Sequence, residues 1–336
     1  MSKCDLEVKL DGNQRTFKPG EIVRGRVRAT PNENVECRGL KLWVGWRTHG
    51  RGNTREDPDA IVKDLFHGNW SAGQAQEYTF EFPAPGGPAT YHGTVLNVDH
   101  YVTATADIPW ASDPRAEVEI LVPGEDGADY DHGPEFASAP NVPLAALTSA
   151  GVKPSPVMKV VFPIVALAAM AGFFFYGGWV ILPVIGLVIA GASFALMKRK
   201  VAERRLGKPL VKLQPNPAKV GGSVAVQVMF EPPTALVLKG GSVKLIGIER
   251  VVSGSGTNRT THRHEVCTVE RPLPFADRRV GAGQPIAVQE TLTLPESCGP
   301  SFMADDNELL WTVHVTIGVE GWPDWENAYP LTVRPR

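Results

Sequence analysis

An uncharged stretch near the middle of the chain constrains the fold more than any other feature. The 38 residues between Lys159 and Lys198 contain no Asp, Glu, Lys or Arg. A single helix of that length would extend about 57 Å, nearly twice the ~30 Å hydrocarbon core of a bilayer. Two helices fit that core better, and Gly177-Gly178 permits a tight reversal between them. The pattern therefore predicts a two-helix transmembrane hairpin over residues 158–198.

Two other interpretations of the stretch stay open. A re-entrant hairpin would dip into the bilayer and return on the same side. A buried hairpin of a soluble protein is disfavoured, because buried soluble helices rarely stay uncharged beyond ~14 residues.

The charges beside the stretch predict its orientation. Lys153 and Lys159 precede it and a basic cluster follows it, so the positive-inside rule places both flanks in the cytoplasm. The N-terminus has no apolar signal-peptide core that would export the first part of the chain. We therefore expect an integral membrane protein with both soluble domains cytoplasmic. The cluster is also a candidate contact for anionic lipids, through Lys198, Arg199, Lys200, Arg204, Arg205 and Lys208.

Both flanking regions have the alternation of β-strands. Leu6, Val8 and Leu10 alternate with charged residues, and residues 311–319 carry the longest such stripe. The 34 Gly and 29 Pro are spread along the chain, as frequent turns require. We predict an all-β fold of two tandem immunoglobulin-like β-sandwiches separated by the transmembrane α-helical hairpin. The expected domains are a first sandwich over 1–122, a flexible acidic Pro/Gly/Ala linker over 123–157, the hairpin over 158–198, and a second sandwich over 199–336.

The two halves share an ordered set of spacings. Gly20, Val23 and Val27 match Gly221, Val224 and Val228, and Thr-x-x-x-Pro strands end at Pro83 and Pro295. We interpret the halves as two copies of one sandwich.

Five segments of the first half resemble the arrestin family in its broad sense, including arrestin-domain proteins and bacterial relatives. They lie in the order of an arrestin N-terminal sandwich: FKPGEIVRGRV (17–27), RGLKLWVGW (38–46), YTFEFP (78–83), PATYHG (88–93) and VDHYVTA (98–104). The resemblance covers roughly residues 5–122 and, more weakly, 210–333.

The resemblance implies two sandwiches that act as an adaptor and not as an enzyme. The chain departs from the family in two ways. A predicted hairpin replaces the short hinge, and Pro232-Pro233 is followed by Thr234-Ala235, so there is no Pro-Pro-x-Tyr motif. Receptor sorting and ubiquitin-ligase recruitment are therefore not carried over.

Composition and motifs narrow the chemistry. A net charge of −2 argues against nucleic-acid binding. The sequence has no Walker loop, GxGxxG, HExxH, GxSxG or CxxC motif, so we predict no cofactor, no catalytic residue and no enzyme activity. His262 and His264, near Glu265 and Cys267, are a weak metal candidate, because spacing fixes only two ligands. Cys4 and Cys37 are interpreted as buried thiols.

Basic side chains on predicted strands form a candidate face for an anion or a partner. Arg24, Arg26 and Arg28 share one side of a strand, and Lys41 and Arg47 are expected nearby. A solvated outer face is the more ordinary interpretation.

The function predicted from these observations is a membrane-anchored arrestin-like scaffold or adaptor that binds protein or peptide partners at the cytoplasmic face of the bilayer. One alternative is an envelope protein with extracytoplasmic binding or adhesive sandwiches. Another is a membrane-bound enzyme with an unrecognised site.

Overall fold

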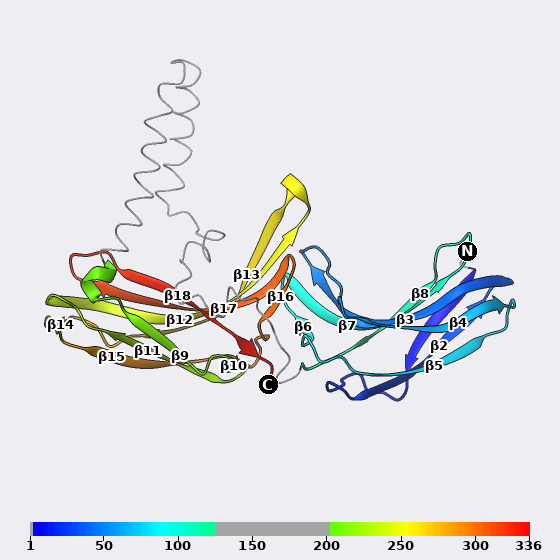
Figure 1. Ribbon diagram of the computed structural model, residues 1–336, viewed down its shortest axis with the longest axis horizontal. Coiled ribbons are helices and arrows are strands. Elements are labelled where there is room, and N and C mark those ends of the chain that lie inside the picture. The colour runs from blue at the N-terminus through cyan, green and yellow to red at the C-terminus, as the bar shows by residue number, and fades with distance from the viewer. Residues whose placement is uncertain (1–2, 125–201) are drawn as a thin grey trace, which may run out of the picture.

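The computed structural model describes residues 3–124 and 202–336 of the chain. These residues are 61% strand and 3% helix. They form two β-sandwiches that lie end to end along the long axis of the molecule (Figure 1).

The first sandwich packs a three-stranded sheet against a five-stranded one. The smaller sheet has the order β1-β2-β5, with β1 (Cys4–Leu10), β2 (Ile22–Pro31) and β5 (Gln76–Pro83). The strands of the larger sheet are β3 (Val35–Gly50), β4 (Ile61–Trp70), β6 (Tyr91–His92), β7 (Leu96–Asp107) and β8 (Arg115–Ile120). Their order is β4-β3-β7-β6, and β8 also pairs with β7. Alternate residues along these strands are apolar, and they fill the space between the two sheets.

The second sandwich repeats this plan with more strands. Its three-stranded sheet has the order β15-β11-β9, with β9 (Leu210–Gln214), β11 (Ser223–Phe230) and β15 (Ile286–Thr293). Its six-stranded sheet contains β12 (Leu236–Ser253), β13 (Thr260–Pro272), β14 (Arg278–Val280), β16 (Phe302–Ala304), β17 (Asn307–Val319) and β18 (Trp325–Leu331). A short parallel pair, β10 (Ala218–Lys219) and β19 (Val333–Arg334), lies beside the C-terminus, and a 3-10 turn, η1 (Gly256–Asn258), joins β12 to β13.

The alternation in the sequence accounts for these strands. In β2 the residues Val23, Val27 and Ala29 are buried while the arginines between them are exposed. The turn glycines of the two halves also correspond. Gly20 and Gly221 have φ of +77° and +76°, a conformation that favours glycine.

The prediction of a transmembrane hairpin is corrected here. Nowhere in the described residues is there a helix with the length and apolar character needed to cross a membrane. The predicted hairpin, 158–198, lies outside the described residues, as does the linker from 125 onward. The prediction relied on the absence of charge, and an uncharged run shows only that a segment avoids water, not that its apolar surroundings are a bilayer. The transmembrane part of the fold class and the integral-membrane localisation are therefore withdrawn.

The predicted lipid contact stays a prediction, and Arg204 and Lys208 are exposed. Lys198, Arg199 and Lys200 lie outside the described residues. Arg205 instead stacks over Trp322, 4.2 Å from the ring centre, and donates a hydrogen bond to Thr234. It therefore packs on the second sandwich itself.

Candidate functional site at the junction of the two sandwiches

A buried carboxylate from the second sandwich holds a turn of the first. Glu249 of β12 is fully buried. Its Oε1 accepts a hydrogen bond from the Tyr91 hydroxyl at 2.6 Å, and its Oε2 accepts one from the Val95 amide at 2.6 Å. The amides of Thr94 and Leu96 donate to the same group at 3.1 and 3.3 Å. Every partner is a donor, so both oxygens of the group act as acceptors.

The local sequence shapes the turn that receives Glu249. Residues 93–95 connect β6 to β7, and the Gly93 amide donates back to the Leu96 carbonyl at 2.9 Å. A Cβ at Gly93 would lie 1.9 Å from Glu249 Oε1, so only glycine allows the carboxylate this close. Burial, and then the hydrogen bond to Glu249, raise the pKa of Tyr91 far above its ordinary value, so its hydroxyl remains a donor.

A second polar contact surrounds Asp306, in the turn between β16 and β17. Asp306 has φ of +65° and accepts hydrogen bonds from Asn53 at 2.9 Å and Arg55 at 3.2 Å, both in the first sandwich. Arg259 of the second sandwich also pairs with it. The hydrogen bond from Asn53 is the main cause that lowers the pKa of Asp306. Burial opposes this effect, and the charges of Arg259 and Arg55 add to it.

Apolar side chains fill the space between these two polar contacts. Trp46 of the first sandwich meets Phe302 of the second edge-on, with ring centres 5.7 Å apart. They belong to one buried cluster with Val95, Leu96, Val98, Val251 and Leu309. Two polar contacts and one apolar cluster therefore fix the two sandwiches in one arrangement.

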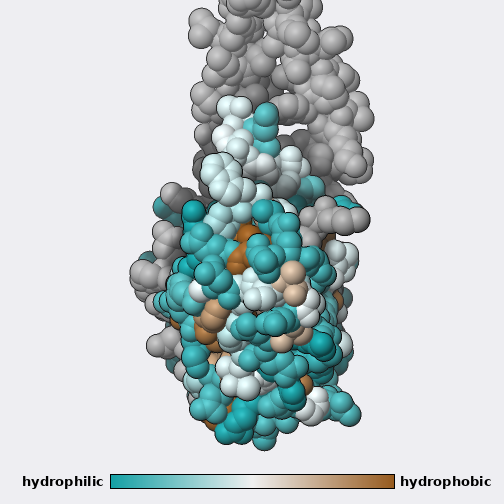
Figure 2. Space-filling view, turned by 90° about the vertical axis from the view of Figure 1, so that its right-hand side faces the viewer, coloured by the Kyte–Doolittle hydropathy of each residue, from teal (hydrophilic) through white to brown (hydrophobic). Residues whose placement is uncertain are grey.

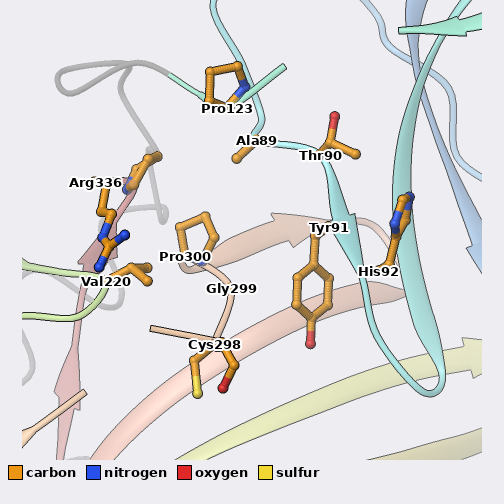
Figure 3. A pocket seen from close by; sticks show the side chains of 12 residues that line it. Ala89, Thr90, Tyr91, His92, Pro123, Val220, Cys298, Gly299, Pro300 and Arg336 are labelled. Carbon is orange, nitrogen blue, oxygen red and sulfur yellow. The ribbon is translucent and has the colours of Figure 1, made fainter. Parts of the chain in front are cut away.

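A hollow of about 310 Å³ opens at the same junction, between the β6 segment and the residues around Cys298 (Figure 3). Tyr91 points toward the Cys298 segment, whereas its neighbour His92 points away from it (Figure 3). Burial, together with the neighbouring Cys267 thiol, raises the pKa of Cys298 to about 12. A thiol with that pKa stays protonated at neutral pH and is a poor nucleophile.

The predicted basic face divides between two sheets. Arg24, Arg26 and Arg28 lie exposed on β2 of the three-stranded sheet, whereas Lys41 and Arg47 lie on β3 of the five-stranded sheet. Arg24 and Arg26 face carboxylates across the sheet, Glu81 at 3.3 Å and Glu77 at 3.4 Å. The structure therefore does not bring the five residues together as one anion site.

Arg47 has a structural environment of its own on the outer face of the five-stranded sheet. It is 7% exposed, and its guanidinium lies 4.6 Å from the Trp43 ring centre and 5.2 Å from that of Tyr101. Glu56 and Glu117 pair with it, each at 3.0 Å. These contacts neutralise its charge and leave it little capacity for an external anion.

The histidines lie in two different settings. On β13, the His262 ring nitrogen lies 3.1 Å from the Ser253 hydroxyl, and His264 is paired in register with Glu249. Among the residues of the two sandwiches, the only group of three closely placed metal-type side chains is His92, Asp99 and Glu119. Cys4 and Cys37 are buried, and burial raises the pKa of the Cys4 thiol to about 11.

Sequence reasoning missed Glu249 although a signal was present. The strand β12 places the odd-numbered residues Val243, Leu245 and Val251 in the core. Glu249 is also odd-numbered and lies on the same side of the strand. A charged residue at a core-facing position of a strand needs a specific partner. The partner itself, the turn after His92, lies more than 150 residues away and has no local signature.

No protein-family model matches the sequence, and no curated protein matches it. The arrestin resemblance therefore stays a prediction from the five segments that carry it.

Proposed function

We propose that the chain is an arrestin-like scaffold or adaptor that binds an extended segment of a partner protein and catalyses no reaction. The observation that carries this proposal is the junction, in which the buried Glu249 carboxylate receives four donors from the first sandwich. Flexibly tethered modules need no such contact. A binding surface that extends over both sandwiches needs their arrangement fixed before the partner arrives.

The chemistry of the junction hollow supports binding over catalysis. Cys298 is the thiol and His92 the imidazole among the residues that line it. The thiol is held protonated by burial, and His92 points away from it. The groups that line the hollow otherwise offer contact surface, not an acid–base pair.

The strand β13 supplies an edge for the partner. Within the described residues it pairs only with β12, and none of its thirteen residues is buried. It stands beside the junction, between the two sandwiches (Figure 1). An edge strand presents unpaired N–H and C=O groups, and an extended peptide can add there as a further strand.

The far end of the first sandwich is a weaker docking surface. In Figure 2, which views the molecule from that end, hydrophilic residues dominate and apolar spots are small and separate. Binding through main-chain hydrogen bonds at an edge does not require a large apolar patch.

Photo-crosslinking in cells tests the proposal. A benzoylphenylalanine replaces Thr261 of β13 in the full chain, and a matched variant carries it at Thr291 of β15. Both threonines are exposed and lie on edge strands of the second sandwich. We expect one partner to be captured from position 261 and not from 291. The captured segment, made as a peptide, should then bind the purified chain.

Proline variants of β13 complete the test. Consecutive backbone N–H groups of a strand point to opposite sides. One of the two variants, Thr261→Pro or His262→Pro, therefore removes an N–H group that faces away from β12. We expect the peptide to bind more weakly to at least one of these variants. Equal capture at both crosslinking positions, or peptide binding that neither proline changes, would contradict strand addition at β13.

A further inference from the structure

Three side chains with metal-binding atoms converge on the outer face of the first sandwich. His92 of β6, Asp99 of β7 and Glu119 of β8 place one ligand atom each within 4.8 Å of one another. His92 Nε2 lies 2.7 Å from Asp99 Oδ1 and 3.7 Å from Glu119 Oε1. Asp99 is buried, whereas the other two are exposed enough to exchange with solvent.

A fourth ligand approaches from β3. The Nε2 atom of His49 lies 4.0 Å from Asp99 Oδ2, the oxygen that His92 does not use. This ring nitrogen is shielded from solvent and has no hydrogen-bond partner among the described residues. A shielded imidazole nitrogen without a partner is costly, and coordination of a cation removes that cost.

The pairing of the sheet explains why four strands meet at this point. Asn97 of β7 is opposite both His49 and His92, and Tyr101 of β7 is opposite Glu119. Asp99 lies between Asn97 and Tyr101 on the same face, so the three other ligands are its diagonal neighbours. Side chains of that length reach each other across such diagonals.

The neighbouring cation does not occupy the site. Arg47 is directly opposite Asp99 in the register, but its guanidinium is held between aromatic rings and pairs with Glu56 and Glu117. The two carboxylates of the cluster therefore face the imidazoles, and His92 and Glu119 are open to solvent.

We propose that His49, His92, Asp99 and Glu119 bind one divalent ion of the Zn²⁺ class. Two imidazole nitrogens and two carboxylate oxygens match tetrahedral Zn²⁺, whereas Mg²⁺ and Ca²⁺ prefer oxygen ligands alone. Zn²⁺ bonds of about 2.0–2.2 Å place adjacent ligand atoms roughly 3.4 Å apart. His92 Nε2 lies 2.7 Å from Asp99 and 3.7 Å from Glu119, on either side of that value. His49, 4.0 Å from the other Asp99 oxygen, lies outside the group of three and must turn toward it to supply the fourth bond.

The bound ion strengthens the junction as well. His92 follows Tyr91, the donor to Glu249, in the two-residue strand β6. An ion that ties His92 to β3, β7 and β8 holds the short segment from which Tyr91 reaches the second sandwich. A ligand that binds only the folded state also raises the unfolding temperature by mass action.

Titration of the full chain with metal tests this site. The protein is stripped with a chelator, dialysed and titrated with ZnCl₂ by calorimetry, with MgCl₂ and CaCl₂ as hard-ion controls. CoCl₂ then gives visible absorption that reports the ligand field. We expect one Zn²⁺ per chain, tetrahedral cobalt bands, and a rise in Tm of roughly 5–10 °C at a hundredfold excess over Kd.

Variants separate this site from the other histidines. His92→Ala and Asp99→Asn should weaken Zn²⁺ binding by more than roughly tenfold, and the half-exposed His49→Ala should weaken it while leaving the fold intact. His262→Ala on β13 is the matched control and should bind as wild type does.

Three results would overturn the proposal: no stoichiometric Zn²⁺ binding by the wild type, binding as tight as that of the wild type in the His92 and His49 variants, or a loss of binding in the His262 variant. The first of these would leave the cluster as a set of hydrogen-bonded side chains without an ion. None of them bears on peptide binding at β13, so the two proposals fail separately.

Discussion

Replacement of Glu249 by Gln should uncouple the two sandwiches. The carboxylate accepts from four donors of the first sandwich and is fully buried. Gln keeps one acceptor oxygen but turns the other position into an NH₂ donor, which then faces backbone N–H groups. It also removes the charge that strengthens each bond.

The expected cost follows from these contacts. A hydrogen bond to a charged group contributes about 1.5–3 kcal/mol, and breaking a buried charged contact on one side costs about 3–5 kcal/mol. Glu249→Gln loses about half of its bonds and leaves donors unpaired, so we expect about 3–5 kcal/mol. Tyr91→Phe removes one donor only and should cost about 1.5–3 kcal/mol. Glu270→Gln, exposed on β13, is the control and should stay within about 0.5 kcal/mol of wild type.

Hydrogen exchange of the full chain is the sharpest assay. The amides of residues 94–96 donate to Glu249. Their exchange should be faster by roughly a hundredfold or more in Glu249→Gln, because each 1.4 kcal/mol corresponds to a factor of ten. Urea unfolding should separate into two transitions as the junction ceases to couple the sandwiches. Unchanged exchange at 94–96 together with a single wild-type transition would refute the role given to Glu249.

Three further variants probe the junction and the outer face. Gly93→Ala places a Cβ 1.9 Å from Glu249 Oε1 and should cost about 2 kcal/mol or more in urea unfolding, whereas Gly281→Ala meets nothing closer than 3.6 Å and should be near neutral. The folded-state pKa of Asp306 is lowered, so its contribution to stability is present above the unfolded value near 4 and is lost as pH falls through the folded value. The stability difference between wild type and Asp306→Asn should therefore be constant near neutral pH and shrink below about pH 4. Arg47→Leu leaves Glu56 without its cation and Glu117 with Arg115 alone, and should cost about 1–3 kcal/mol.

The strands were the predictable part of the fold because their signal is local. In β2 and β17, the alternation between apolar and polar residues in the sequence is the alternation between buried and exposed residues in the structure. Period two follows from strand geometry alone, so no knowledge of the partner strand is needed. The same alternation correctly predicted that Arg24, Arg26 and Arg28 lie on one face of the strand.

The alternation within a strand does not predict the sheet to which that strand belongs. Lys41 and Arg47 also alternate correctly, but β3 joins the five-stranded sheet and β2 the three-stranded one. Strand pairing depends on contacts far apart in sequence, and those contacts decide whether two basic stripes meet. The prediction of a transmembrane hairpin was wrong for a related reason. Hydropathy describes a segment itself and not what surrounds it in the folded protein.

The cluster of proposed metal ligands shows the same limit, because the sheet brings together residues that the sequence does not connect. His49, His92, Asp99 and Glu119 come from four strands, and no two of them have a spacing that signals a metal site. The His-x-His pair on β13 has such a spacing, yet in the described structure it gathers no further ligands. Register across a sheet, which sequence alone leaves open, is what assembles the outer-face cluster.

The dipeptide Tyr91-His92 explains why the two sites are neighbours. Successive residues of a strand point to opposite faces. Tyr91 therefore reaches Glu249 in the junction, and His92 reaches Asp99 on the outer face. Any ligand that fixes His92 restricts the backbone that carries Tyr91, so occupancy of the outer face and the alignment of the sandwiches are thermodynamically linked. By the same linkage, Glu249→Gln should weaken Zn²⁺ binding although Glu249 is not a ligand, and the size of that effect measures the coupling between the two sites.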